Sequence, residues 1–179
     1  MPPVDAVTAA PIVAMPAGST VPLTPLTVLT LGLDDEVFAI DAGCVREILE
    51  MVPVTEVPGS LPLVNGLINV RGRVVPLADI RLSFGMTQRD ATLDTRIVVV
   101  EIPLNGEPTT IGLLADKVFE VTDLRPADLA ETPKLGMRWP AELIRCIGKR
   151  GSDFIIVCEI AELFSTARGS ARAGNTAAH

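Results

Sequence analysis

The chain lacks the side chains on which most enzyme mechanisms and nucleic-acid contacts depend. Its 179 residues include no tyrosine, one tryptophan and a single histidine, His179, which is the last residue. Histidine is the side chain most often used as a general base near neutral pH, and aromatic rings supply the stacking surfaces of single-strand binders. The net charge of −7 also disfavours a polyanionic partner, because non-specific phosphate binding depends on clustered lysine and arginine. These absences predict a protein that is not an enzyme and that binds no nucleic acid.

Cofactor and metal signatures are missing as well. The sequence contains no GxGxxG, no GxxxxGK[ST] and no HExxH, so we expect no cofactor and no metal. The three cysteines, Cys44, Cys146 and Cys158, are odd in number and show no CxxC spacing, which favours reduced, buried thiols. Cys146 is the nearest candidate nucleophile because Arg145 precedes it, but on a strand its side chain points away from its sequence neighbours. We therefore expect Cys146 to be structural.

Long hydrophobic runs are also absent. Although 48% of the residues are hydrophobic and the mean hydropathy is +0.42, no stretch approaches the roughly 18 apolar residues that a membrane-spanning helix needs. The first basic residue is Arg46, so the start of the chain does not resemble a secretory signal and we expect a cytoplasmic protein. Residues 1–25, rich in alanine and proline, and residues 168–179, small and polar, are expected to be flexible tails.

What the sequence does contain is a series of short strands separated by turn residues. The most complete unit is NGLINVRGRVVPLADIRLSFG (65–85), in which two alternating strands meet at Gly72. A short helix is predicted to follow over Ile80–Phe84, ended by a glycine. Such a turn places Arg71 and Arg73 in water at the tip of a hairpin.

Further hairpins are expected on both sides of this one. Alternating apolar residues predict strands at Leu26–Leu33 and Val37–Ile40 around an acidic turn whose charges we expect to be solvated. A second pair is predicted at Arg96–Ile102 and Thr109–Leu114, around a turn at Pro103–Pro108. The abundance of β-branched residues with recurrent glycine and proline favours a strand-rich fold.

The segment VREIL (45–49) fits a strand better than a helix. As a strand it places Val45, Glu47 and Leu49 on one face and Arg46 and Ile48 on the other. A helix capped by Asp41 remains the alternative.

The end of the chain is predicted to hold a long connection and one helix. Residues 122–140 lose the alternating pattern, which indicates a surface connection whose end Trp139 anchors. Helical spacing of apolar residues then predicts a short amphipathic helix, with an apolar face made by Ile160, Leu163, Phe164 and Ala167.

The two halves of the sequence resemble one another. VREI (45–48) recurs as VFEV (118–121). At an offset of eighty residues, Val75, Asp79, Ile80 and Phe84 recur as Ile155, Glu159, Ile160 and Phe164. Self-similarity of this kind indicates a duplicated structural unit. We therefore infer two related small β-barrels, because closure removes the unpaired edges that short strands otherwise expose.

Several segments resemble the family of the chemotaxis coupling protein CheW, namely VREI, PVTEVPGSLPLVNGLINVRGRVVPLADIRLSFG, TTIGLLADKVFEV and FIIVCEIAELF. The resemblance begins at LTVLTLGLDDEVFAID and leaves only the tails outside, which implies one CheW-like domain at 26–167. Family members consist of two SH3-like five-stranded β-barrels on a shared apolar core. The resemblance thus implies a mainly β fold with short helices, including a C-terminal one. It places a first barrel at about 37–88 and a second at about 94–158, with the first and last strands free to exchange between them.

The same resemblance implies a function. Members of the family have no catalytic activity and link chemoreceptors, the methyl-accepting chemotaxis proteins, to a CheA-type histidine kinase. They bind the cytoplasmic hairpin tip of the receptor and the regulatory domain of the kinase, at arrays under the inner membrane and without inserting into it. Matched position by position, the receptor-binding residues would be Val45, Glu47, Ile48, Asn69, Val70, Arg71 and Gly72. We expect Arg71 to be the anchor, whereas the motifs assign no kinase-binding residues.

Two points keep alternatives open. The closed barrels could instead bind a small ligand in their apolar interiors, although small barrels usually fill the interior with side chains. The sequence also departs from the family pattern in its Pro/Ala-rich leader and in the segment GMRWPAELIRC (136–146). Flagellar chemotaxis, pilus motility and another chemoreceptor-like array are the alternative outputs of the pathway.

Overall fold

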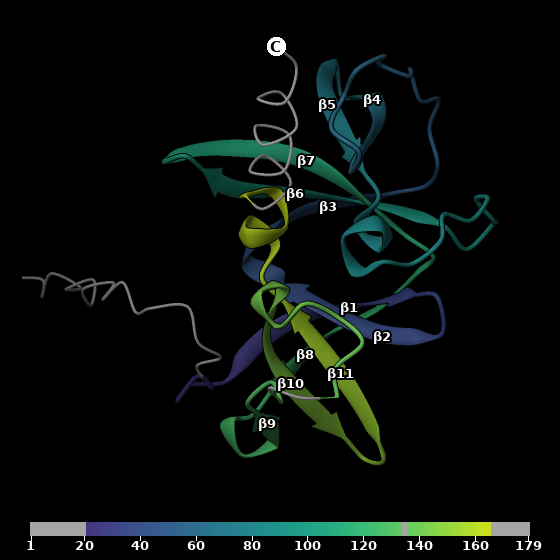
Figure 1. Ribbon diagram of the computed structural model, residues 1–179. Coiled ribbons are helices and arrows are strands. Elements are labelled where there is room, and N and C mark those ends of the chain that lie inside the picture. The colour runs from purple at the N-terminus through teal and green to yellow at the C-terminus, as the bar shows by residue number, and fades with distance from the viewer. Residues whose placement is uncertain (1–20, 134–135, 166–179) are drawn as a thin grey trace, which may run out of the picture.

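The computed structural model describes residues 21–133 and 136–165, which form a mainly β fold of two sheets (Figure 1). In chain order the strands are β1 (Leu26–Leu33), β2 (Glu36–Asp41), β3 (Val45–Leu49), β4 (Val64–Val70), β5 (Arg73–Ala78), β6 (Arg96–Leu104), β7 (Glu107–Ala115), β8 (Lys117–Leu124), β9 (Leu129–Ala130), β10 (Ile144–Arg150) and β11 (Asp153–Cys158). Short 3-10 turns are η1 (Ala42–Cys44), η2 (Ile80–Phe84), η3 (Pro126–Asp128) and η4 (Ala141–Leu143). Residues 160–165 form an α-helix. In the part of the chain described, no helix is long and apolar enough to cross a membrane.

The two sheets follow one plan. One has the strand order β3–β6–β7–β5–β4 and the other β8–β1–β2–β11–β10, extended at its end by the two-residue β9. Neighbouring strands are antiparallel except for β5–β7 and β2–β11, which occupy equivalent places and are both parallel. We call the first set unit 1 and the second unit 2; Figure 1 shows them in the upper and lower halves of the molecule. The expected mainly β fold of two related five-stranded SH3-like units is thereby confirmed.

The strands are distributed between the units differently from the expected ranges 37–88 and 94–158. Unit 1 is the continuous stretch from β3 to β7, and unit 2 combines the hairpin β1–β2 with β8 to β11. The hairpin β6–β7 therefore lies in unit 1, and β2 lies in unit 2. Hairpins are local signals in a sequence, whereas the parallel contacts β5–β7 and β2–β11 join distant segments, so local patterns could not assign each hairpin to its sheet.

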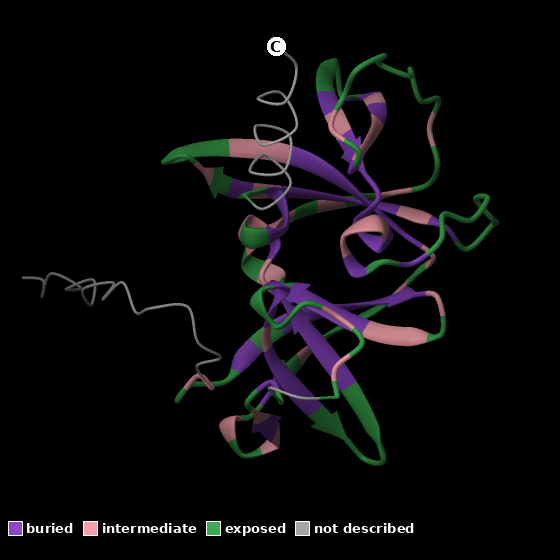
Figure 2. Ribbon diagram, viewed as in Figure 1, coloured by how far each residue is buried: buried purple, intermediate pink, exposed green. Residues whose placement is uncertain are grey.

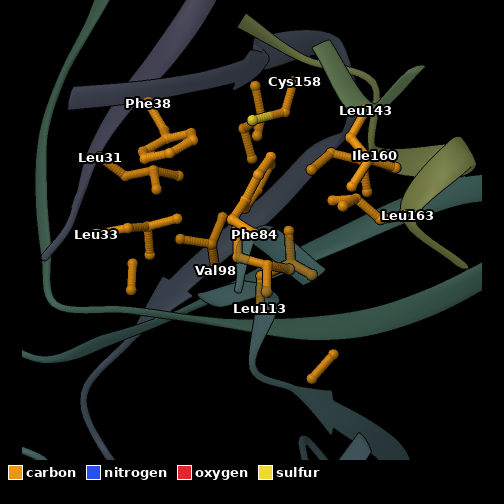
Figure 3. Close-up of a cluster of buried hydrophobic side chains, with 14 of the residues drawn as sticks. Leu31, Leu33, Phe38, Phe84, Val98, Leu113, Leu143, Cys158, Ile160 and Leu163 are labelled. Atoms are coloured by element: carbon orange, nitrogen blue, oxygen red, sulfur yellow. The ribbon is translucent and has the colours of Figure 1, made fainter. Parts of the chain in front are cut away.

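Three buried clusters hold the fold together, and Figure 2 shows buried residues along the strands of both units. The largest lies between the units and combines side chains from both, such as Leu31 and Phe38 of unit 2 with Val98 and Leu113 of unit 1 (Figure 3). Each unit also has its own interior cluster: Ile68, Val70, Val75, Leu77, Ile97, Val99 and Leu114 in unit 1, and Leu26, Val28, Ala39, Leu124, Leu129, Cys146, Ile155 and Val157 in unit 2. The β6 strand contributes to two clusters because successive side chains point to opposite faces.

The turns explain where strands end. Arg71 and Gly72 form the two-residue turn between β4 and β5, with φ of 52° and 82°. Positive φ at both positions suits the right-handed twist of a hairpin. The β6–β7 turn is Asn105–Gly106, with φ of 55° and 81°, rather than the whole of Pro103–Pro108. The predicted turn was too long because this Asn-Gly pair reverses the chain alone, which leaves Pro103 and Pro108 opposite each other in the ladder.

Several local predictions can be compared with the structure. The strand over residues 45–49 is confirmed, while Asp41 caps only the three-residue turn η1. The short helix over Ile80–Phe84 is confirmed as a 3-10 turn, ended by Gly85 in a left-handed conformation. The 122–140 segment begins with strand β8, which continues to Leu124, so the connection is shorter than expected.

The end of the described chain packs as expected. Trp139 contacts Phe38 edge-on, with ring centroids 5.5 Å apart. In the helix at 160–165, Ile160, Leu163 and Phe164 belong to the shared core, whereas Ala167 lies outside the described residues. Most of both expected tails lies outside them too, although Val21 packs against the interior cluster of unit 2.

All three cysteines are free. Cys146 and Cys158 are buried, as expected, and burial raises the pKa of both thiols. Cys44 is only half-buried, because it lies in η1 rather than on an apolar strand, and its Sγ donates to the backbone oxygen of Asp41 at 3.0 Å. Burial, reinforced by the Asp41 carboxylate, raises the pKa of Cys44 to about 11.

Candidate functional site

A hollow lies between the two units, where strands β3 and β8 form the edges of their sheets. Ile48 of β3 lines one side, and Val118 and Phe119 of β8 line the other. The two edges correspond in the duplication, since β3 contains VREI and β8 contains VFEV. We call this surface the inter-unit groove, and we include in it the neighbouring exposed residue Val121 of β8.

The groove exposes large apolar side chains. Phe119 is 53% exposed, Val121 is 59% exposed, and Ile48 is also exposed. Alternation along β8 produces this arrangement, because Phe119 and Val121 point outward while Val118 packs against the shared core. Contiguous apolar surface on a soluble protein usually marks an interaction site. The groove is therefore suited to binding an apolar surface of another protein.

Charged groups border the groove. Lys117 and Asp94 form an ion pair at 3.7 Å on one side, and both line the hollow. Arg96 of β6 lines the same hollow. A partner that enters the groove would thus meet the apolar side chains of Ile48, Val118 and Phe119 together with charges of both signs.

The hairpin tip β4–β5 reaches β3 through an ion pair. The Nε of Arg71 donates to both carboxylate oxygens of Glu47, at 3.1 and 3.2 Å. The Arg71 side chain is 81% exposed and that of Glu47 is 22% exposed. Such an exposed pair contributes only about 0–1 kcal/mol to stability. The pair also orients the Arg71 side chain. One N–H of its guanidinium is bonded to Glu47, and the other four N–H donors are held toward solvent.

The other predicted receptor-binding residues have structural positions. Asn69 accepts a hydrogen bond from the backbone N–H of Gly72 at 2.8 Å and so fixes the hairpin turn. Val70 is buried in the interior of unit 1, and Val45 packs against the shared core. The structure therefore exposes Ile48, Asn69, Arg71 and Gly72, leaves Glu47 and Val45 partly buried, and buries Val70.

Sequence reasoning missed the contribution of unit 2. Lys117, Val118 and Phe119 line the other side of the hollow, and Val121 is exposed two residues beyond Phe119. Arg150 at the β10–β11 hairpin pairs with Glu120 as Arg71 pairs with Glu47. The recurrence of VREI as VFEV was a sufficient signal for Phe119 and Val121, since it marks them as the counterparts of Arg46 and Ile48. Nothing in the sequence indicated that the two segments face one groove.

No metal site accompanies this surface in the ranges 21–133 and 136–165, where no group of three or more His, Cys, Asp or Glu side chains is arranged to hold an ion.

Comparison with known proteins identifies the family. The sequence model of the CheW-like domain matches residues 27–168. The chain belongs to the CheW-like family. The resemblance found in the sequence is thereby confirmed, and the match covers both units.

Individual relatives agree with this assignment. The chemotaxis protein CheW of Klebsiella aerogenes is 30% identical over 139 residues, which cover 78% of this chain and 80% of the relative. The chemotaxis protein CheW of Treponema pallidum is 27% identical over 140 residues, covering 77% of this chain and 81% of the relative. The crystal structure of the scaffolding protein TtCheW from Thermoanaerobacter tengcongensis superposes with a TM-score of 0.69 at 27% identity, covering 78% of this chain and 92% of that one.

Proposed function

We propose that this chain is a non-catalytic chemotaxis adaptor that joins chemoreceptors to a CheA-type histidine kinase. Its relatives are named chemotaxis proteins, and TtCheW is named a scaffolding protein. Within the molecule, the observation that carries the proposal is the exposure of Phe119, Val121 and Ile48 at the inter-unit groove. Those side chains have no structural reason to face water, whereas an adaptor needs such a surface.

The groove receives the cytoplasmic hairpin tip of the receptor. An amphipathic helix binds a groove by placing its apolar residues at i, i+3, i+4 and i+7 against the floor. Phe119 and Val121 supply the apolar floor, and Arg71 supplies a planar donor for a carboxylate or carbonyl on the helix. This division of roles makes Arg71 an orienting contact and Phe119 the main source of buried apolar area.

The kinase regulatory domain binds elsewhere, at the hairpin tips of the units. Val74 at the β4–β5 tip and Phe154 at the β10–β11 tip are both exposed, and they are equivalent positions in the duplication because they are eighty residues apart. Family resemblance assigns kinase binding to the apolar ends of the barrels. Separate surfaces would let receptor and kinase bind at the same time, at arrays under the inner membrane.

The interior of the units supports an adaptor over the alternative of a small-ligand-binding barrel. Each interior cluster is filled by its own side chains, which are at most 9% exposed. Filled interiors are usual for small barrels. The thiols likewise favour a non-catalytic role, since burial raises the pKa of Cys44 to about 11 and leaves little nucleophilic thiolate near neutral pH.

Calorimetric titration tests the proposal. The chain is titrated with a receptor hairpin fragment, with the kinase regulatory domain, and with each in the presence of a saturating amount of the other. We expect both partners to bind and neither to displace the other. Failure of the wild-type chain to bind either one would overturn the proposed function, and a metabolite that raises the unfolding midpoint would favour the ligand-binding alternative.

A further inference from the structure

A buried cluster of charged side chains lies where the two units meet, outside the inter-unit groove. Arg81 in η2 belongs to unit 1, and its side chain is 3% exposed. Its Nε and Nη2 donate to the two carboxylate oxygens of Asp79, each at 2.8 Å. Its Nη1 donates to Oδ1 of Asp116, also at 2.8 Å. One guanidinium is thus held in a fixed orientation by two carboxylates.

Asp116 connects this arginine to unit 2. It lies between β7, the last strand of unit 1, and β8, where the chain returns to unit 2. Its Oδ2 accepts the backbone N–H of Asp34 at 2.8 Å, and its own N–H donates to the backbone oxygen of Gly32 at 3.0 Å. Gly32 and Asp34 belong to the β1–β2 hairpin of unit 2. The side chain of Asp116 therefore bonds to both units at once.

A second link crosses the same joint. The carboxylate of Asp34 pairs with Arg89, which lies in the segment between η2 and β6. The backbone oxygen of Arg89 in turn accepts from Nη2 of Arg81 at 3.4 Å. Charge-assisted bidentate contacts of this kind add geometric specificity as well as energy.

The joint is adjacent to the groove. Lys117 follows Asp116 and begins β8, and Lys117, Val118 and Phe119 line the hollow. The position of Asp116 relative to unit 1 therefore sets where Phe119 lies relative to Ile48 on β3. A shift at this joint would change the width of the groove without removing any side chain from it.

We propose that the contact between Arg81 and Asp116 is a positioning contact that fixes the two units relative to each other and so sets the geometry of the inter-unit groove. The nature of the groove's ligand rests on the proposed function, whereas the positioning of the units does not. Arg81 and Asp116 act through β8 and have no contact with the ligand. Their substitution should weaken groove binding and leave binding at the hairpin tips unchanged.

The test variant is Asp116→Asn, which keeps the size of the side chain and leaves Asp79 to neutralise Arg81. The matched control is Asp128→Asn, because Arg125 donates to Asp128 at the same distance of 2.8 Å but within unit 2. If Asp116→Asn does not fold, Arg81→Lys replaces it, since lysine keeps the charge but lacks the planar fork that donates to both carboxylates.

Two measurements are made on the full chain. The first is the distance distribution between spin labels at Glu107→Cys in unit 1 and Ser152→Cys in unit 2, in a Cys44→Ala background. We expect a broader or shifted distribution for Asp116→Asn and no change for Asp128→Asn. The second is affinity for the receptor hairpin fragment, which we expect to fall about fivefold or more for Asp116→Asn, while affinity for the kinase regulatory domain is unchanged.

The outcomes separate the positioning role from a merely structural one. A lower unfolding midpoint with an unchanged distance distribution would overturn the proposal, and so would weaker receptor binding without any change in distance. Failure of the wild-type chain to bind the receptor fragment would overturn the proposed function alone, because the distance measurement would still test the joint.

Discussion

Units 1 and 2 have the same strand plan but present different edges to the inter-unit groove. The outward face of β3 in unit 1 carries Arg46 and Ile48, and Arg46 is paired with Glu101. At the corresponding positions, β8 in unit 2 carries Phe119 and Val121. The unit 1 side of the hollow thus carries Asp94 and Arg96 beside Ile48, whereas the unit 2 side carries one charge, Lys117, beside the apolar Val118 and Phe119.

Inward-facing positions changed much less. Val45 and Val118 both pack against the shared core, and so do Phe84 and its counterpart Phe164. The comparison teaches that the duplication retained the residues that hold the two units together and altered those that face a partner. In this account unit 2 supplies apolar affinity and unit 1 supplies orientation through Arg71.

The largest effect is expected from Phe119→Asp, which removes the apolar contribution of unit 2. Receptor binding should weaken by about 3 kcal/mol, because a central aromatic anchor is lost and a charge is buried in its place. Stability should change little, since Phe119 is half exposed in the free protein. Calorimetric titration with the receptor hairpin fragment, alongside the unfolding midpoint, measures both.

The matched control is Phe154→Asp, a change of the same kind at an exposed phenylalanine of the same unit. It should leave receptor binding intact and weaken kinase binding. Equal loss of receptor binding in both variants would contradict the assignment of the groove to β8.

Charge reversal at the unit 1 hairpin is expected to have the next largest effect. Arg71→Glu should cost about 2 kcal/mol of receptor binding, because it removes the planar donor and places a negative charge against the carboxylate or carbonyl that this donor would bind. Its stability should shift by less than about 0.5 kcal/mol, as is usual for an exposed turn. The same titration and unfolding experiment measures these changes.

Two controls sharpen the comparison. Arg73→Glu tests charge on the same hairpin, and Arg150→Glu tests the corresponding hairpin of unit 2, where Arg150 pairs with Glu120. If either control lost as much receptor affinity as Arg71→Glu, the effect of Arg71→Glu would be non-specific electrostatics. An unaltered affinity in Arg71→Glu would remove Arg71 from the site.

A further contrast between the units concerns stability. Gly66 in β4 and Cys146 in β10 are equivalent, eighty residues apart, and each follows an irregularity of register. A Cβ at Gly66 would lie 2.5 Å from the backbone oxygen of Thr55. Gly66→Ala should therefore lower the free energy of unfolding by about 2 kcal/mol through overpacking, measured by urea unfolding.

At Cys146 a substitution would cause underpacking, because the thiol fills part of the interior of unit 2. Cys146→Ala should lower the free energy of unfolding by about 1 kcal/mol, through the small cavity it leaves. If Gly66→Ala left the free energy of unfolding unchanged, the close approach of Thr55 to β4 would not constrain the fold.

The smallest effect concerns the thiols. Because the pKa of Cys44 is raised to about 11, its reaction with a thiol reagent should be slow at pH 8 and should accelerate toward pH 11 rather than pH 9. Cys146 and Cys158, which are buried, should react only on unfolding. Since the folded pKa of Cys44 exceeds the unfolded value, its contribution to stability is present below about pH 9 and is lost as the pH rises toward 11. Rapid modification of Cys44 at pH 7 would contradict the raised pKa.

Much of the fold could be predicted from local patterns, because those patterns have local causes. The β4–β5 hairpin follows from alternation and Gly72, the 3-10 turn at η2 from Asp79 and Gly85, and the duplication from matches at a fixed offset. The pairing of β2 with β11 and of β5 with β7 could not be predicted, because it depends on contacts between distant segments.

The candidate site was predictable to a smaller extent. Glu47, Ile48 and Arg71 came from a family resemblance, and the structure brings them to the surface. Phe119 and Val121 were marked by the recurrence of VREI as VFEV, but that β3 and β8 face one groove depends on how distant segments pack and could not be predicted. The buried cluster of Arg81 was missed because an arginine in a sequence is expected on the surface, and only its three-dimensional surroundings show that two carboxylates hold it.

The central claim is that both units contribute to one receptor-binding groove. The most direct test is to record amide chemical shifts of the isotope-labelled full chain while the receptor hairpin fragment is added. We expect the largest shift changes on β3, on β8 around Phe119 and Val121, and at the β4–β5 turn around Arg71, with few elsewhere. Changes concentrated at the β10–β11 hairpin around Phe154, or confined to unit 1 with β8 unaffected, would contradict it.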